Sequence, residues 1–283
     1  MKELKFTKMH GLGNDFVYLD GIAENLPRLD LPKLTQSICN RQTGVGADGL
    51  IVMLPSKTCD FRMRIFNADG GEAEMCGNGF RGMIRYLNDC GHSKSKIIRV
   101  ETLAGTISGE IVKSGKNAPL VRVAMGVPEF HCNKIDVDTA HKEFIERKIK
   151  IKSESYTITV VSMGNPHAVL FVPDFKFDWH GAGREIEYYK LFPKRTNVEF
   201  VKIIMRSKIL VHSWERGVGP TMASGTGASA AVAAGIRCGY LDDSVEVVYD
   251  LGSLIIEWKN RDQDLFKTGP AEYSFTGTYK YYL

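Results

Sequence analysis

Two stretches of this sequence share one pattern of cysteine or serine, glycine and apolar residues: Cys76-Gly-Asn-Gly79 through Cys90-Gly91, and Ser224-Gly-Thr-Gly227 through Cys238-Gly239. Both span 16 positions, at an offset of 148 residues. In each, Gly-x-Gly precedes an apolar run and a glycine follows it, as expected of a helix that ends in a left-handed cap. We therefore predict two equivalent helices, Gly79–Asp89 and Gly227–Arg237.

Other blocks repeat in the same order, at offsets between 147 and 151 residues. The pairs are Gly13-Asn14 with Gly164-Asn165, Ala47–Val52 with Asn197–Lys202, Phe66–Gly70 with Trp214–Gly217, and Ile98–Ile111 with Val245–Trp258. One shared glycine pair would mean little, but five ordered blocks indicate a duplicated domain. The repeat predicts two halves related by a pseudo-two-fold axis.

Each half has the pattern of a mainly β structure with one main helix. Strands are predicted at Phe61–Phe66, Ile97–Thr102, Val121–Met125, Thr157–Ser162, Ile209–Trp214, Val245–Tyr249 and Leu254–Trp258, and short helices within Pro32–Asn40 and Ala182–Leu191. The predicted class is α+β, with each half a mainly antiparallel sheet or barrel around its central helix. We place one half at residues 1–120 plus 271–283 and the other at 121–270, with His131–Lys150 as a surface connection joining them and the active site in the cleft between them.

Composition excludes several classes of protein. The 283 residues are 43% hydrophobic and 25% charged, with a net charge of +4, as in ordinary globular chains. No run of like charges indicates binding to nucleic acid or a membrane surface. The start of the sequence lacks the features of a secretory signal, which predicts a cytoplasmic protein. The six cysteines and seven histidines have no metal-ligand spacing, so we expect reduced thiols, no metal and no organic cofactor.

A glycine-opened helix start presents backbone N–H groups and a positive dipole end to an anion. Two such starts, related by duplication, can act on one carboxylate from both sides. Cys76 stands directly before the first helix, where the pKa of a thiol falls towards neutrality. Cys76 is thus the predicted reactive cysteine of the six.

Five motifs together resemble the diaminopimelate epimerase family: Met9–Phe16, Phe66–Gly70, Cys76–Gly79, Gly164–His167 and Glu215–Gly217. The similarity runs from Met9 to Gly269. It implies pyridoxal-independent epimerisation of LL- to meso-diaminopimelate, a step of lysine and peptidoglycan synthesis. Family members commonly form homodimers.

The resemblance also implies roles for individual residues. Inverting an α-carbon requires one group to take a proton and another to give one on the opposite face. Cys76 is one of these groups, with His167 as its proton partner, and Ser224 and Glu215 belong to the other side. The backbone around Gly77, Asn78, Gly225 and Thr226 would hold the proximal carboxylate. The resemblance assigns binding of the distal amino-acid end of the substrate to Asn67, Asn165, Asn197, Glu215 and Arg216. The Arg216 guanidinium would bind the distal carboxylate, and Asn14 would line the pocket.

The sequence departs from the family at Ser224, where the family has its second cysteine, and also at Pro220 and Ser229. A serine hydroxyl is a far weaker acid than a thiol. Three explanations fit: Ser224 is an engineered substitution, or it is natural and aided by Glu215 or a water, or the chain performs one-base chemistry. Alternative functions are therefore a one-base lyase or dehydratase, a racemase of another amino acid, and a non-catalytic amino-acid-binding relative.

Overall fold

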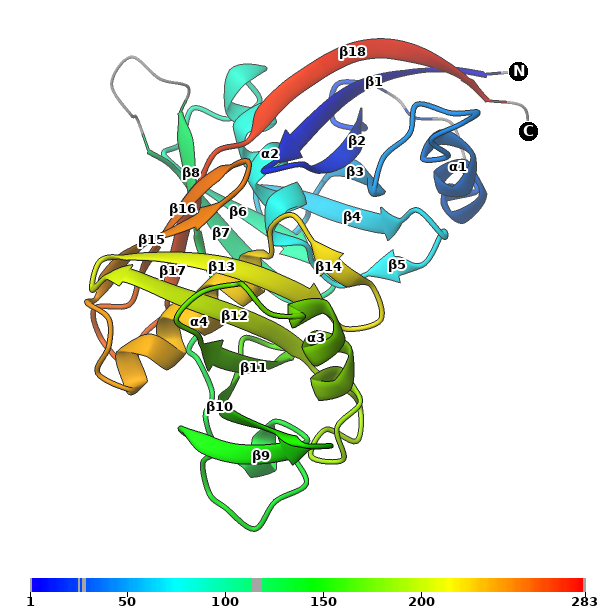
Figure 1. The fold of residues 1–283 in the computed structure, drawn as a ribbon. Helices are drawn as coiled ribbons and strands as arrows, with labels where there is room; N and C mark the ends of the chain where they lie inside the picture. Colours follow the sequence, from blue (N-terminus) through cyan, green and yellow to red (C-terminus); the bar gives the residue numbers. More distant parts are fainter. Residues whose placement is uncertain (1, 25, 27–28, 113–118, 282–283) are drawn as a thin grey trace. The chain divides into compact units, whose positions relative to one another are not determined.

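A computed structural model of the chain describes residues 2–24, 26, 29–112 and 119–281, and its contacts divide the chain into two units. Unit 1 is Met1–Val123 with Gly269–Leu283, and unit 2 is Ala124–Thr268. The boundaries predicted from the sequence, after residues 120 and 270, lie within three residues of these. Each unit is described by itself, and Figure 1 shows the elements of both.

Unit 1 contains ten labelled elements from β1 to β8 and one further strand, β18. They are β1 (Lys2–Gly11), β2 (Asn14–Asp20), α1 (Leu31–Ile38), β3 (Gly49–Pro55), β4 (Phe61–Asn67), β5 (Glu72–Ala73), α2 (Gly77–Asp89), β6 (Ile97–Thr102), β7 (Gly105–Val112) and β8 (Leu120–Ala124), with β18 (Glu272–Tyr281) returning to pair with β1. β2 pairs antiparallel with β1 and parallel with β3. β4 pairs antiparallel with β3 and parallel with β6, and β7 pairs antiparallel with β6 and β8.

Unit 2 repeats this topology element by element. It contains η1 (Cys132–Lys134), β9 (Arg147–Ile151), β10 (Glu154–Ser162), β11 (Pro166–Phe171), α3 (Trp179–Glu187), β12 (Asn197–Met205), β13 (Lys208–Glu215), β14 (Gly219–Thr221), α4 (Gly225–Arg237), β15 (Ser244–Tyr249), β16 (Gly252–Glu257) and β17 (Phe266–Gly269). β11 pairs antiparallel with β10 and parallel with β12. β13 pairs antiparallel with β12 and parallel with β15, and β16 pairs antiparallel with β15 and β17. The predicted α+β fold of two halves with one topology is confirmed.

The central helices occupy the core of their units as predicted. α2 packs on β1, β2 and β7, and buries the apolar face formed by Phe80, Met83, Ile84 and Leu87. α4 packs on β10 to β13, β15 and β16, and every residue from Gly227 to Gly235 is buried. Both helices begin two residues earlier than predicted, at Gly77 and Gly225, and both are followed by a glycine with positive φ, Gly91 (75°) and Gly239 (79°).

The asparagines of the repeated Gly-Asn motif follow the glycines of two hairpin turns. In unit 1 the β1–β2 turn consists of Leu12 and Gly13, both with positive φ (55° and 87°). This conformation matches a type I′ hairpin and is strained for a leucine. In unit 2 the β10–β11 turn contains Gly164 with φ 91°. Asn14 is therefore the first residue of β2, and Asn165 directly precedes the first residue of β11.

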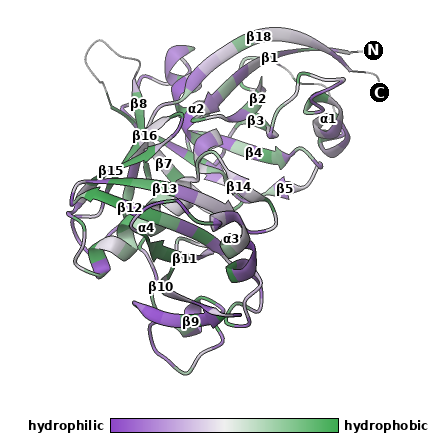
Figure 2. Cartoon of the chain, in the orientation of Figure 1, coloured by the Kyte–Doolittle hydropathy of each residue, from purple (hydrophilic) through white to green (hydrophobic). Residues whose placement is uncertain are grey.

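The segment His131–Lys150 is not a surface connection, so that prediction was wrong. It belongs to unit 2, and η1 and β9 contribute Cys132, Ile135 and Ile149 to a hydrophobic cluster with strands β10 to β13 and α3. In Figure 2, β9 is mainly hydrophilic, whereas β11 and β12 are hydrophobic. The hydrophilic character of β9 is the reason that the sequence predicts a surface segment here. The apolar residues of this segment are spread between charged ones, yet they pack inward.

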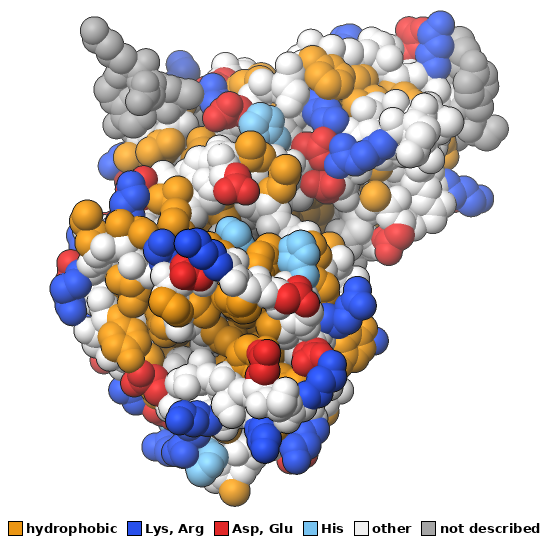
Figure 3. Space-filling view, in the orientation of Figure 1, with side chains coloured by type: hydrophobic (Ala, Val, Ile, Leu, Met, Phe, Trp, Pro, Cys, Tyr) orange, Lys and Arg blue, Asp and Glu red, His pale blue; other side chains and the backbone are white. Residues whose placement is uncertain are grey.

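The outer face of unit 2 is covered by hydrophobic and aromatic side chains over β12, β13 and α3 (Figure 3). Here the rings of Phe175 and His212 stack with their centroids 4.0 Å apart, and burial lowers the pKa of His212.

Among the described residues, no helix is both long and apolar enough to cross a membrane.

A buried carboxylate ties the end of α3 to the turn that follows β13. Glu187 Oε2 accepts a hydrogen bond from Trp214 Nε1 at 2.8 Å, and Glu187 Oε1 accepts one from the Gly217 N–H at 2.9 Å. Glu187 is 3% exposed. This link fixes the Glu215-Arg216-Gly217 turn, which carries candidate site residues.

We expect Trp214→Phe to lower the free energy of unfolding by about 1–3 kcal/mol, since it leaves a buried carboxylate oxygen without its donor. Urea denaturation measures the change. Trp179→Phe is the matched control, because the described contacts include no hydrogen bond from its indole N–H. Equal losses in both variants would contradict a structural role for the Trp214–Glu187 bond.

Candidate active site

The start of α2 in unit 1 carries the cysteine that the sequence singles out. Cys76 is the N-cap, with extended backbone (φ −138°, ψ 119°), and its side chain does not cap the helix. Because the first helical hydrogen bond runs from the Phe80 N–H to the Cys76 carbonyl, the N–H groups of Gly77, Asn78 and Gly79 have no acceptor within the helix. A partly buried thiol thus lies beside three backbone donors.

Asn14 connects the hairpin turn to this helix start. Its Oδ1 accepts from Asn78 Nδ2 at 3.1 Å and lies 3.7 Å from Cys76 Sγ. Its Nδ2 donates to Asp48 Oδ2 at 2.7 Å, which fixes the orientation of the amide. The structure therefore brings together three of the residues predicted for unit 1: Asn14, Cys76 and Asn78.

A buried arginine stands close to the same thiol. Arg81 of α2 is fully buried, and its Nε donates to the Pro270 carbonyl at 3.1 Å. Burial lowers the pKa of Arg81 to about 10, and the negative charge of a Cys76 thiolate opposes that change. The guanidinium therefore keeps its positive charge at neutral pH, and that charge favours the thiolate.

The environments of four other cysteines differ from that of Cys76. Burial raises the pKa of the Cys39 thiol to about 12, and it also raises the pKa values of Cys90, Cys132 and Cys238. None of the four precedes a helix that begins with Gly-x-Gly. These thiols are protonated at neutral pH.

The corresponding helix start in unit 2 is built differently. Ser224 is the N-cap of α4, and its Oγ accepts a hydrogen bond from the Gly227 N–H at 3.2 Å. The hydroxyl also hydrogen-bonds to the carboxyl group of Glu215. Ser224 is 4% exposed, and Tyr249 donates to its carbonyl oxygen at 3.0 Å. The serine is held in place from three directions.

Glu215 is a carboxyl group suited to holding a proton. Burial raises its pKa, while hydrogen bonds from Ser224 and Thr221 oppose the rise. The bond from Thr221 Oγ1 to Glu215 Oε1 is 3.2 Å. A raised pKa lets a carboxyl group exchange protons nearer to neutrality.

His167 is fully buried and both of its ring nitrogens contact oxygen atoms. Nδ1 lies 3.0 Å from Glu199 Oε1, and Nε2 lies 3.0 Å from Asn165 Oδ1. Both contacts are of hydrogen-bond length, and Glu199 is itself fully buried. The ring is thereby paired with a buried carboxylate.

Asn197 and Arg216 are linked through the backbone. Asn197 Oδ1 accepts from the Arg216 N–H at 3.0 Å, and Asn197 Nδ2 donates to the Pro166 carbonyl at 2.8 Å. The Arg216 side chain is exposed, with a long bond of 3.3 Å to the Lys194 carbonyl. Asn67 ends β4 with an exposed side chain. Gly225 and Thr226 form the half-exposed first turn of α4.

Glu199 is a site residue that the sequence motifs did not single out. The third helical residue of α2, Gly79, lies against Ile51, and the equivalent Gly227 of α4 lies against Glu199 Oε1. Within the apolar strand Asn197–Val201, Glu199 is fully buried, and its Oε2 has no hydrogen-bond partner among the described residues. A charged residue within an otherwise apolar strand is the sequence signal that could have found it.

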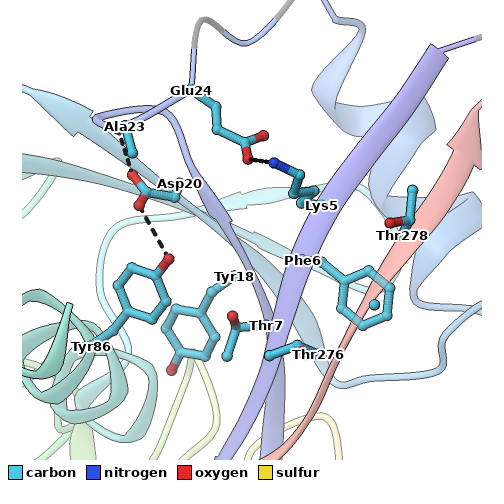
Figure 4. A pocket seen from close by; sticks show the side chains of 11 residues that line it. Lys5, Phe6, Thr7, Tyr18, Asp20, Ala23, Glu24, Tyr86, Thr276 and Thr278 are labelled. Atoms are coloured by element: carbon cyan, nitrogen blue, oxygen red, sulfur yellow. Dashed lines mark hydrogen bonds and ion pairs between the residues drawn. The ribbon is translucent and has the colours of Figure 1, made fainter.

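A separate pocket of about 450 Å³ lies in unit 1 and is shown in Figure 4. Its polar groups mostly pair with each other: Lys5 with Glu24 at 3.1 Å, and Tyr86 with Asp20 at 3.1 Å. The described ranges also hold no group of three histidine, cysteine or acidic side chains arranged for a metal ion. We assign no role to this pocket.

A family model for diaminopimelate epimerase matches residues 6–131 and 159–274. The chain belongs to the diaminopimelate epimerase family. The diaminopimelate epimerase of Halothermothrix orenii is 46% identical, with 97% of each chain covered. That of Pelotomaculum thermopropionicum is 45% identical, over 98% of this chain and 99% of the relative.

Solved structures at lower identity share the fold. A hydroxyproline epimerase from Agrobacterium vitis with bound trans-4-hydroxy-L-proline has a TM-score of 0.69 at 12% identity, covering 98% of this chain and 92% of that one. A Bacillus anthracis phenazine biosynthesis protein of the PhzF family has the same TM-score at 16% identity, covering 99% and 100%. The likeness confirms the fold class of this diaminopimelate epimerase family member.

We expect iodoacetamide at pH 8 to alkylate Cys76 at least about 100-fold faster than Cys39, because the thiolate is the nucleophile and burial keeps Cys39 protonated. Peptide mass spectrometry of timed, quenched samples measures both rates in one experiment. Alkylation of Cys39 at the rate of Cys76 would contradict the assignment.

Proposed function

We propose that this chain interconverts LL- and meso-diaminopimelate, taking a proton from one face of the α-carbon and returning one to the other. As a member of its family the chain is an isomerase of the epimerase type. The observation that carries the proposal is Cys76, a thiol at a helix start that it does not cap, beside Asn14 and the backbone donors of α2.

The chemistry needs charge stabilisation because an amino-acid α-proton is very weakly acidic. When the proton leaves, the electron pair of the C–H bond moves into the α-carboxylate. Preorganised N–H donors at the position of the developing charge stabilise that state. We propose that the N–H groups of Gly77 and Asn78, together with those of Gly225 and Thr226, bind this carboxylate, and that pyridoxal is not required.

The two units have distinct proposed tasks. Cys76 in unit 1 serves one face of the α-carbon, and the Ser224 side in unit 2 serves the other. This assignment treats the units as halves of a duplicated domain that act on one substrate. His167 and Glu199, whose Nδ1 and Oε1 atoms lie 3.0 Å apart, form a buried pair near the unit 2 helix start.

The distal amino-acid end is the proposed ligand of Arg216 and its neighbours. A guanidinium binds a carboxylate in a bidentate manner. Asn197 holds the Arg216 backbone through a 3.0 Å hydrogen bond, while the side chain stays exposed to ligand. Asn67 and Asn165 are the further proposed contacts at this end.

Two further proposals concern the setting of the enzyme. A reactive thiol at Cys76 requires a reducing compartment, which supports a cytoplasmic protein. The homodimer that is common in the family is proposed here on the strength of the resemblance alone.

We expect the chain to convert LL-diaminopimelate to the meso form in deuterated water, with deuterium entering the inverted α-position, and Cys76→Ala to reduce this conversion at least about 100-fold. Proton NMR follows exchange, and chiral chromatography follows inversion. Cys90→Ala is the matched control, because it alters the other end of the same helix.

Full activity of Cys76→Ala would contradict the proposal. Exchange without inversion in the unaltered chain would instead support one-base chemistry through Cys76. Tight binding of diaminopimelate with no exchange would support the alternative of a non-catalytic binding protein.

A further inference from the structure

A lysine that no motif indicates lies at the start of α4. Lys267 of β17 is fully buried. Its Nζ would lie only 2.4 Å from a Cβ placed on Gly225, with its Cε at 3.5 Å and its Cδ at 3.6 Å. The amine therefore lies against the first helical residue of α4, and a side chain at Gly225 would displace it.

An ammonium at this place is costly. Burial penalises the charged form, and the N-terminal end of a helix is itself positive. Two carboxyl groups lie at the same helix start, since Glu199 lies against Gly227 and Glu215 hydrogen-bonds to Ser224. Buried titratable groups whose charged form is subject to opposing electrostatic effects are found at sites of proton transfer in proteins.

The serine of this helix start is poorly suited to carrying the proton alone. Ser224 Oγ already accepts from the Gly227 N–H at 3.2 Å and hydrogen-bonds to Glu215. A hydroxyl must also become an alkoxide to act as a base. An amine exchanges its proton far more readily, and lysine is a usual general acid or base.

Lys267 also shares the burial of the residues proposed to contact substrate. Ser224 and Asn78 are 4% and 8% exposed, and Lys267 is 0% exposed. Its distance from a Cβ built on Gly225 puts the amine beside one of the residues whose N–H groups are proposed to hold the α-carboxylate. The α-carbon is bonded to that carboxylate, so the proposal places it within reach of the amine.

We propose that Lys267 is the catalytic residue that exchanges a proton with the substrate on the Ser224 side, in place of the family's second cysteine. This inference rests on the proposed epimerisation. In one direction the Cys76 thiolate takes the α-proton, the electron pair of the broken C–H bond moves into the carboxylate, and the Lys267 ammonium gives its proton to the opposite face. A thiol and a neutral amine remain, and they perform the reverse direction.

The test is the α-proton exchange of each epimer in deuterated water, measured separately for LL-diaminopimelate and for the D centre of the meso form. In Lys267→Met, inversion falls at least about 100-fold, but Cys76 still removes and returns a proton on its own face. One epimer therefore exchanges without inversion and the other does not. Cys76→Ala shows the reciprocal pattern, with exchange confined to the other epimer.

Two further variants separate a chemical role from a structural one. In Lys267→Ala, added methylamine restores inversion in proportion to its concentration, because it supplies the missing amine. In the double variant Ser224→Cys with Lys267→Met, a thiol at the helix start restores inversion. Lys208→Met is the matched control, since this strand lysine pairs with Glu246 at 3.0 Å on the neighbouring strand.

Three outcomes would overturn the role of Lys267: unchanged inversion in Lys267→Met, equal loss of exchange from both epimers, or failure of methylamine to restore Lys267→Ala. The Cys76 alkylation rate shows whether each Lys267 variant is folded. If the unaltered chain exchanges neither epimer, the proposed function itself is wrong. If it inverts the α-carbon while Lys267→Met also does, the role of Lys267 alone is wrong.

Discussion

The structure depends on the opening turn of each central helix, where backbone N–H groups are left without helical acceptors. Glycines make this turn possible because close neighbours leave no room for a side chain. At Gly79 the neighbour is Ile51, at Gly227 it is Glu199, and at Gly225 it is Lys267. The strands around α2 and α4 pair in the same order in both units, so each helix start has the same backbone surroundings. The backbone of each start provides N–H donors, and the side chains around it determine the chemistry.

The two starts have diverged in charge. Unit 1 offers a thiol beside an amide oxygen and a buried arginine, and the positive charge of the arginine favours a thiolate. Unit 2 offers a hydroxyl with two carboxyl groups, a buried histidine and a lysine. Replacing a thiol by Ser224 alone would remove a proton-carrying group. The accompanying changes in charge around α4 fit a natural divergence of one side, in which the proton moves from sulfur to another atom.

Much of this could be predicted from the sequence because the repeat carries it. The Gly-x-Gly starts, the terminal glycines and the ordered strand blocks identified both helices and the fold class. The segment His131–Lys150 could not be predicted, because its apolar residues alternate with charged ones and their partners are distant in sequence. Lys267 was missed for a similar reason, since Phe266-Lys-Thr-Gly269 is an ordinary strand until β17 is placed beside α4. The side chains of Asn67 and Arg216 are exposed, and the roles of both residues stay predictions.

The most direct measurement is a crystal structure of the unaltered chain with bound meso-diaminopimelate. We predict that one α-carboxylate oxygen lies about 3 Å from the N–H groups of Gly77 or Asn78 and that the other lies about 3 Å from those of Gly225 or Thr226. We also predict that Cys76 Sγ and Lys267 Nζ lie on opposite faces of the same α-carbon. A substrate whose carboxylate binds away from both helix starts, or whose α-carbon has no contact with Cys76, would contradict it.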